Sequence, residues 1–194
     1  MKNINTIGPD MMGFIFYSGS PRYMANHLTP ADLKSLSSTI IKTGVFVNES
    51  CDEILRISEL YELNAVQLHG SESPETCKTI SRAGFTVLKA FRVNDDFSFE
   101  QTEAYKESCR FFVFDAFGAG YGGNGIRFNW DKLQTYQGDT PFLLSGGLDV
   151  EDVQVLKDLK HPHLAGFDIN SKFEIQPGEK DTVKVARFIS LLRS

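Results

Sequence analysis

Residues 111–115 read Phe-Phe-Val-Phe-Asp, a run of four apolar residues that ends on a carboxylate. A short run that is apolar on both faces is typical of a strand in a parallel sheet whose two faces are both covered. Similar runs recur at intervals of 21 to 33 residues and predict six more strands, at Met11–Phe16, Gly44–Val47, Ala65–Leu68, Thr86–Ala90, Pro141–Leu144 and Gly166–Ile169.

The segments between these runs carry signals of helices. Thr29 and Pro30 offer an N-cap followed by proline in the first turn, and Leu33, Leu36, Ile40 and Ile41 then recur at helical spacing. Comparable signals predict helices after Ser73-Pro74, over Val150–Leu159 with Asp149 as cap, and over Asp181–Leu192.

Seven strand–helix units without a linker or a shift in composition predict one domain, spanning residues 1–194. We expect an α/β fold of the (β/α)8 TIM-barrel type, with seven of its eight strands visible. A doubly wound sheet is less favoured because its first turn would carry GxGxxG. The glycine-rich stretch GAGYGGNG at 118–125 does not match that spacing, and we expect it to be a mobile loop.

The composition excludes several classes of protein. With 20 basic and 25 acidic residues the net charge is -5, which argues against binding to nucleic acid or to an anionic membrane surface. No apolar run is long enough to span a membrane, and the first residues do not resemble a signal peptide. Three widely spaced cysteines form neither a disulfide framework nor a metal motif, so we expect a cytoplasmic protein.

In barrels of this kind the reacting groups lie at the carboxyl ends of the strands. Arg22, after the first run, suits a carboxylate or phosphate, although it could equally be a solvated loop residue. Gln67 and His69 share one face of their strand and are expected near the mouth of the barrel, where His69 either hydrogen-bonds to neighbouring strands or contacts substrate. Asp115 ends a very apolar strand and is a candidate general acid, with a capping role as the alternative.

Glycines and small polar residues follow the last two predicted strands. They are Gly146 and Gly147 after one strand, and Asp168, Asn170 and Ser171 after the next, with Lys172 adding a charge. Successive strand ends of this composition often bind phosphate through backbone N–H groups, although a tight turn would also explain the glycines.

In this order the motifs resemble the phosphoribosylanthranilate isomerase family of tryptophan biosynthesis. The resemblance covers nearly the whole chain. It is carried by Gly13-Phe14-Ile15-Phe16-Tyr17, Ser20-Pro21-Arg22-Tyr23, Gly44-Val45-Phe46-Val47-Asn48, Val66-Gln67-Leu68-His69-Gly70, Lys89-Ala90-Phe91, Asp115, Gly122-Gly123-Asn124-Gly125, Trp130, Ser145-Gly146-Gly147-Leu148, and residues 168–174 with Pro177-Gly178, Lys180 and Asp181.

The resemblance implies an aldose–ketose isomerase. The reaction is an Amadori rearrangement of N-(5-phosphoribosyl)anthranilate to 1-(2-carboxyphenylamino)-1-deoxyribulose 5-phosphate, and it needs no cofactor. By position, Asp115 is the general acid, Arg22 holds the anthranilate carboxylate, and Gly146, Gly147, Asn170 and Ser171 hold the phosphate. Asp168 has a supporting role near the sugar and His69 is a substrate contact. The partner is then a small phosphoribosyl compound, and the protein is a monomer or a homodimer.

The chain differs from the family in two places. Family members begin with a strand and turn similar to Lys-Ile-Cys-Gly, whose cysteine is the general base, whereas Met1–Thr6 resembles only the later part of the helix that follows. If Met1 is the natural start, we expect a shortened barrel with two unpaired strand edges and activity reduced about 10²–10⁴-fold. We expect none of Cys51, Cys77 and Cys109 to replace that base. Lys172-Phe173 stands where the family usually has glycine and a small apolar residue, and the lysine could crowd the phosphate.

Two alternative functions remain at this point. One is a non-catalytic barrel that still binds a phosphorylated ligand. The other is a different phosphosugar isomerase or epimerase, but an epimerase would need metal ligands and the histidine-pathway isomerase a second aspartate in place of the cysteine. A purely structural protein gives no reason for Arg22, Asp115 and two glycine-rich strand ends to occur together.

Overall fold

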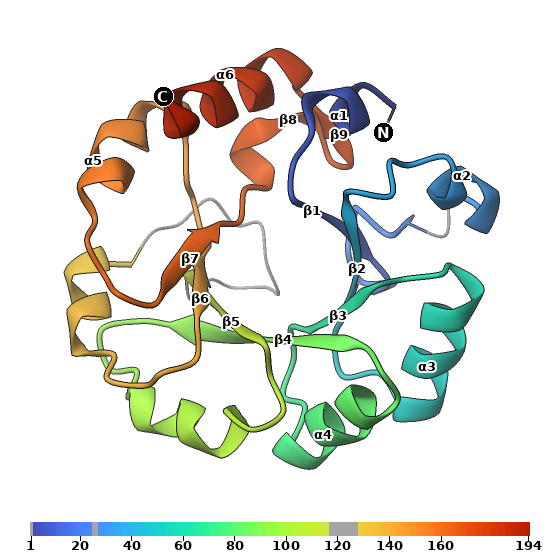
Figure 1. The fold of residues 1–194 in the computed structure, drawn as a ribbon, viewed down its shortest axis with the longest axis horizontal. Coiled ribbons are helices and arrows are strands. Elements are labelled where there is room, and N and C mark those ends of the chain that lie inside the picture. Colours follow the sequence, from blue (N-terminus) through green and yellow to red (C-terminus); the bar gives the residue numbers. More distant parts are fainter. Residues whose placement is uncertain (1, 25–26, 117–127) are drawn as a thin grey trace.

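The computed structural model describes residues 2–24, 27–116 and 128–194 (Figure 1). The glycine-rich stretch 118–125 lies outside the described residues. Seven strands form one sheet: β1 (Met11–Ile15), β2 (Ile41–Phe46), β3 (Ala65–Leu68), β4 (Thr86–Val93), β5 (Phe111–Ala116), β6 (Phe142–Leu144) and β7 (Leu164–Phe167). Each strand pairs in parallel with the next in the chain, from β1 to β7. All seven predicted strands are confirmed.

Helices surround the curled sheet (Figure 1). The α-helices are α1 (Lys2–Ile7), α2 (Pro30–Lys34), α3 (Cys51–Leu60), α4 (Pro74–Arg82), α5 (Val153–Asp158) and α6 (Thr182–Arg193). Single turns or short runs of 3-10 helix are η2 (Phe99–Tyr105), η3 (Trp130–Thr135), η4 (Val150–Asp152) and η5 (Ser171–Phe173), and a small hairpin pairs β8 (Glu174–Gln176) with β9 (Glu179–Lys180). The architecture is that of a (β/α)8-type barrel.

The sheet is not closed by the described residues, since no hydrogen-bonded pair joins β7 to β1 within them. The exposure of the strands agrees with this, because every residue of β3 is buried whereas those of β7 are all partly or fully exposed. Helix α1 packs beside α6 (Figure 1). Arg193 at the end of α6 pairs with Asp10 at 3.1 Å. The edges of β1 and β7 are therefore not paired with each other within the described part of the chain, as expected from the sequence, whereas α1 and α6 meet beside them.

Side chains fill both faces of the sheet. Between the strands and the helices lies a large apolar core in which Phe46, Phe112, Phe114 and Phe142 are fully buried. Inside the curl is a smaller cluster that contains Ala65, Leu88, Ala90 and Val113, packed with Met11, Phe111 and Leu143. Because side chains alternate along a strand, the inner cluster fixes which residues at the strand ends point inward.

The predicted helix starts are confirmed in most places. Ser73 and Asp181 accept hydrogen bonds from the first-turn backbone of α4 and α6, as N-caps do. Ser50, which was not among the predicted caps, does the same for α3. Asp149 caps a 3-10 turn, η4, before α5 begins.

The predicted continuation of the helix after Pro30 to Ile40 and Ile41 is wrong. Helix α2 ends at Lys34, and the hydroxyl of Ser37 contacts that of Thr39 at 2.7 Å and accepts from the backbone N–H of Thr39. Such local hydrogen bonds compete with a helix, and Ile41 becomes the first residue of β2.

Within the described residues, no helix is both long and apolar enough to cross a membrane.

Candidate functional site

The inward-facing positions of the strands place the polar residues of the site. Ala65 and Val113 belong to the inner cluster, so Gln67 and His69 beyond β3, and Asp115 near the end of β5, point inward at the carboxyl ends of their strands. All three of these polar side chains are buried. The predicted common face of Gln67 and His69 is confirmed.

His69 contacts Asp115 directly. Its Nε2 lies 3.2 Å from Oδ2 of Asp115, and its Nδ1 lies 2.9 Å from Nε2 of Gln67. Since the amide nitrogen of Gln67 is a donor, Nδ1 accepts, and the ring proton sits on Nε2 and is donated to Asp115. Both ring nitrogens are thereby occupied, which favours the expected hydrogen bond to a neighbouring strand over a direct contact with substrate.

A narrow pocket opens beside Asp115. Its lining residues are Asp115, Ser145, Gly146, Gly147, Leu148, Asp168, Asn170, Ser171 and Lys172, so six of the predicted site residues share one pocket. Gly146 has φ +92°, and a Cβ there would lie 2.6 Å from the backbone nitrogen of Ala116 and 3.1 Å from Oδ1 of Asp115. Only glycine allows this loop to approach the acid so closely.

Asp168 faces Asp115 across the pocket. Its Oδ2 accepts a hydrogen bond of 3.1 Å from the hydroxyl of Ser145. Burial raises the pKa of Asp168, and the charge of Asp115 raises it further, while His69 and Ser145 act in the opposite direction. Asp168 therefore holds a proton more readily than an exposed aspartate does.

Lys172 lines the pocket, whereas Phe173 points away from it. The Phe173 ring is fully buried and packs on Phe188 of α6 at 5.0 Å between ring centroids. Nζ of Lys184 lies 5.2 Å from the same ring and donates to the backbone oxygen of Lys172. The larger aromatic residue thus anchors the loop to α6, and the exposed Lys172 side chain stands at the rim of the pocket.

Two predicted site residues, His69 and Arg22, do not line the pocket, although His69 contacts Asp115 directly. Arg22 pairs instead with Glu174, whose Oε2 accepts a hydrogen bond from Nε at 2.8 Å and forms an ion pair with Nη2 at 2.7 Å. Oε1 of Glu174 accepts from Nζ of Lys180 at 2.9 Å and from the backbone N–H of Gly178 at 3.1 Å. Lys180 in turn donates to Oδ1 of Asn170, which does line the pocket. Arg22 is therefore joined to the pocket through two charged residues.

Glu174 and Lys180 were not singled out from the sequence as site residues. The sequence signal for this hairpin is weak. Pro177-Gly178 indicates only a turn, and Ile175, the apolar residue between Glu174 and Gln176, is exposed and does not mark a buried face. The pairing depends on the β8–β9 hairpin, which folds Lys180 back onto Glu174.

The three cysteines lie away from the pocket, as expected. Cys51 begins α3, Cys77 is buried in α4, and Cys109 is buried before the first residue of β5, at the opposite end of the barrel from Asp115. A hydrogen bond to Cys77 and burial raise the pKa of the Cys109 thiol, so it remains protonated.

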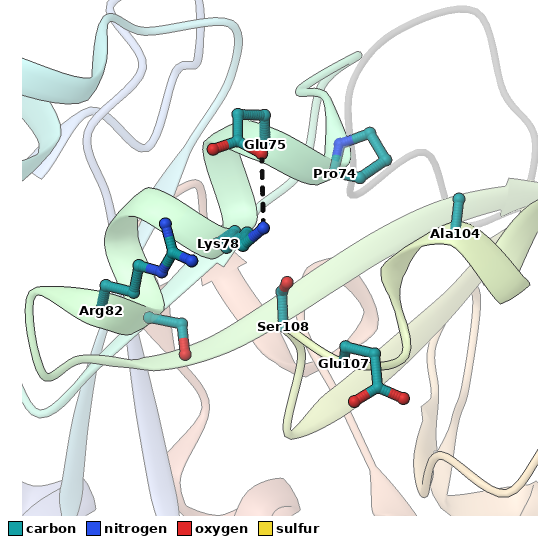
Figure 2. Close-up of a pocket in the computed structure, with 8 residues that line it drawn as sticks. Pro74, Glu75, Lys78, Arg82, Ala104, Glu107 and Ser108 are labelled. Carbon is teal, nitrogen blue, oxygen red and sulfur yellow. Dashed lines mark ion pairs between the residues drawn. The ribbon is translucent and has the colours of Figure 1, made fainter.

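A larger groove of about 350 Å³ lies on the outside, between α4 and η2 (Figure 2). It is lined by Pro74, Glu75, Lys78, Ser81, Arg82, Ala104, Glu107 and Ser108. Figure 2 shows Lys78 directed at Glu75, an ion pair of 4.0 Å between exposed side chains. The groove contains none of the strand-end residues, so the smaller pocket is the candidate site.

The fold and the pocket define a class of protein. An aspartate with a histidine partner, a second aspartate of raised pKa and a glycine loop gather at the carboxyl ends of barrel strands. This is the arrangement of a barrel enzyme that performs acid–base chemistry on a small anionic substrate.

Comparisons with known proteins identify the family. Residues 2–191 match the family model for N-(5'-phosphoribosyl)anthranilate (PRA) isomerase. The PRA isomerase of Parabacteroides distasonis is 40% identical over 192 residues, which cover 97% of this chain and 86% of the relative. That of Phocaeicola vulgatus is 40% identical over 193 residues, 100% of this chain and 92% of the relative.

Solved structures agree with the sequence comparisons. The enzyme from Thermotoga maritima superimposes with a TM-score of 0.83 at 34% identity, covering 98% of this chain and 91% of that chain. A PRA isomerase in complex with reduced 1-(o-carboxyphenylamino)-1-deoxyribulose 5-phosphate superimposes with a TM-score of 0.79 at 31% identity, covering 98% and 90%. The Thermotoga maritima protein is also described as dimeric.

The chain belongs to the PRA isomerase family. It is an enzyme of tryptophan biosynthesis that catalyses an intramolecular isomerisation, and the alternative of a non-catalytic phosphate-binding barrel is not favoured.

Proposed function

We propose that the pocket at the strand ends performs the Amadori rearrangement of N-(5-phosphoribosyl)anthranilate with Asp115 as the general acid. The observation that carries this proposal is the contact between Nε2 of His69 and Oδ2 of Asp115. It leaves Oδ1, the oxygen beside Gly146, facing the pocket. Oδ1 is then the atom that delivers a proton to the substrate.

The chemistry proceeds in two proton transfers. Asp115 gives its proton to the ribose ring oxygen as the bond from that oxygen to C1′ breaks, and the open chain forms a Schiff base with the anthranilate nitrogen. A base then removes the proton from C2′, and the resulting enolamine tautomerises to the ketone. Cys51, Cys77 and Cys109 are too far from the pocket to be that base, as described above.

The remaining residues of the pocket bind the two anionic ends of the substrate. The phosphate is held at the loop of Gly146 and Gly147 and at Asn170 and Ser171, where the positive φ of both glycines turns the backbone toward the pocket. Because the side chain of Asn170 is taken up by Lys180, its contribution comes from the backbone. Arg22 binds the anthranilate carboxylate, and Asp168, whose pKa is raised by burial and by Asp115, stands near the sugar.

The relative crystallised with the reduced product supports this assignment of ligand class. We further propose that residues 1–194 form a single domain that acts in the cytoplasm as a monomer or homodimer without nucleic acid. The acidic net charge of -5 and the dimeric Thermotoga maritima relative are the support, and size-exclusion chromatography distinguishes the two oligomeric states.

Turnover of N-(5-phosphoribosyl)anthranilate by the purified protein tests the proposed acid. We expect Asp115→Asn to lower kcat by about 10²–10⁴-fold, since the amide cannot donate the proton. The matched control is Asp139→Asn, which changes a fully exposed aspartate and leaves kcat unchanged. If Asp115→Asn retains kcat within a factor of two, Asp115 is not the acid.

A further inference from the structure

We propose that Glu174 is a positioning residue, which holds the guanidinium of Arg22 by one edge and turns its other edge to the carboxylate of the substrate. The proposal rests on the proposed function, in which Arg22 binds that carboxylate. It adds a residue of the β8–β9 hairpin that controls affinity for one end of the substrate without touching it.

The two edges of the Arg22 guanidinium have different surroundings. Nε donates a hydrogen bond to Oε2 of Glu174 and Nη2 forms an ion pair with the same oxygen, so the Nε–Nη2 edge is occupied by one carboxylate oxygen. Within the described part of the chain, Nη1 makes no hydrogen bond or ion pair. A guanidinium presents parallel N–H groups on each edge, and the Nη1–Nη2 edge can accept a second carboxylate.

Glu174 is itself fixed rather than mobile. Its side chain is only 4% exposed, and Oε1 is bound by Nζ of Lys180 and by the N–H of Gly178. Burial raises the pKa of Glu174, but hydrogen bonds from Arg22 and Lys180 outweigh that effect and lower the pKa below its ordinary value. The carboxylate therefore stays charged and keeps Arg22 in one orientation at neutral pH.

The same cluster links Arg22 to the pocket. Lys180 bridges Glu174 and Asn170, so Arg22, the β8–β9 hairpin and the segment of Asn170 are held in fixed positions relative to one another. Such preorganisation raises affinity because the side chain does not have to be ordered when the ligand binds. A substrate with a carboxylate benefits from it, and one without does not.

The test uses two probes with the full-length protein. They are reduced 1-(o-carboxyphenylamino)-1-deoxyribulose 5-phosphate and the same compound without the carboxyl group, with Kd measured by calorimetry. We expect Glu174→Ala to weaken binding of the carboxylated probe about tenfold and to change the Kd of the other probe less than twofold. Glu174→Gln, which keeps an acceptor for Arg22, should restore most of the affinity, and Glu179→Ala on the same hairpin is the control.

The two probes separate the possible outcomes. Equal weakening of both probes by Glu174→Ala, or tighter binding of the carboxylated probe, would overturn the proposal, because the first indicates general disruption and the second competition for Arg22. If Glu174→Ala does not fold, Glu174→Asp must show the same selective loss. Arg22→Ala tests the underlying function separately: if it is not selective for the carboxylated probe, Arg22 does not bind the carboxylate, whatever Glu174 does.

Discussion

At the scale of single residues, Asp168 shows that an environment suited to the site can lower the stability of the fold. Burial and the neighbouring Asp115 raise the pKa of Asp168 above its ordinary 3.8, so the folded protein binds a proton there that the unfolded chain gives up. Stability is therefore lost as pH rises from 3.8 through the folded pKa. Strained or poorly solvated groups of this kind are typical of active sites.

A substitution tests this linkage. We expect Asp168→Asn to raise Tm at pH 7, because the amide keeps an acceptor for Ser145 and removes the cost of ionisation. The gain should shrink as the pH falls toward 3.8, because the carboxyl of Asp168 is then protonated in the folded wild-type protein. Calorimetric melts between pH 4 and 8 measure it, with Asp139→Asn as control. A lower Tm at pH 7 would show that the charged form of Asp168 stabilises the fold.

Individual site residues were predictable where strand alternation alone determines direction. Gln67, His69 and Asp115 point inward as the spacing of their strands requires. The partner of Arg22 was not predictable, because residues 22 and 174 meet only once the chain has completed the barrel. Long-range ion pairs leave no periodic signal in the sequence.

At the scale of elements, one buried ion pair ties the loop after β3 to β4. Nζ of Lys89 lies 3.2 Å from Oε2 of Glu72 and donates to the backbone oxygens of Leu68, Gly70 and Ala90. Glu72 also accepts from the backbone N–H groups of Asn48 and Gly70, which joins the loop after β2. His69 lies within this loop, so the pair supports the site from behind the sheet.

Breaking this pair should be costly. We expect Glu72→Gln to lower the free energy of unfolding by about 3–5 kcal/mol, since it leaves the charge of Lys89 buried without a counter-ion. Urea unfolding measures the change, and the double variant Glu72→Gln, Lys89→Met should recover part of it. The exposed pair of Glu75 and Lys78 provides the control, where Glu75→Gln should change stability by less than about 0.5 kcal/mol. Equal effects at the two pairs would contradict the assigned role.

The elements themselves followed from the sequence to different degrees. Strand β3 has the predicted bounds, and the caps Ser73 and Asp181 begin α4 and α6. Strand β7 begins and ends two residues earlier than predicted, where its pairing with β6 is irregular. The hairpin of β8 and β9 was missed because Ile175 is exposed and no apolar face marks it.

At the scale of the whole molecule, seven parallel strands in chain order bring residues from four distant segments to one mouth. His69, Asp115, Ser145 and Asp168 each lie at the carboxyl end of a different strand, and only the order β3 to β7 places them together. Length and periodicity predicted that arrangement because every strand–helix unit obeys the same packing rule.

The most direct test of the central claim is complementation of a tryptophan auxotroph that lacks PRA isomerase. We expect the chain to restore growth without tryptophan, and the Asp115→Asn variant, expressed to the same level, to fail. Growth with Asp115→Asn, or absence of growth with soluble wild-type protein, would contradict the account of a strand-end isomerase that depends on Asp115.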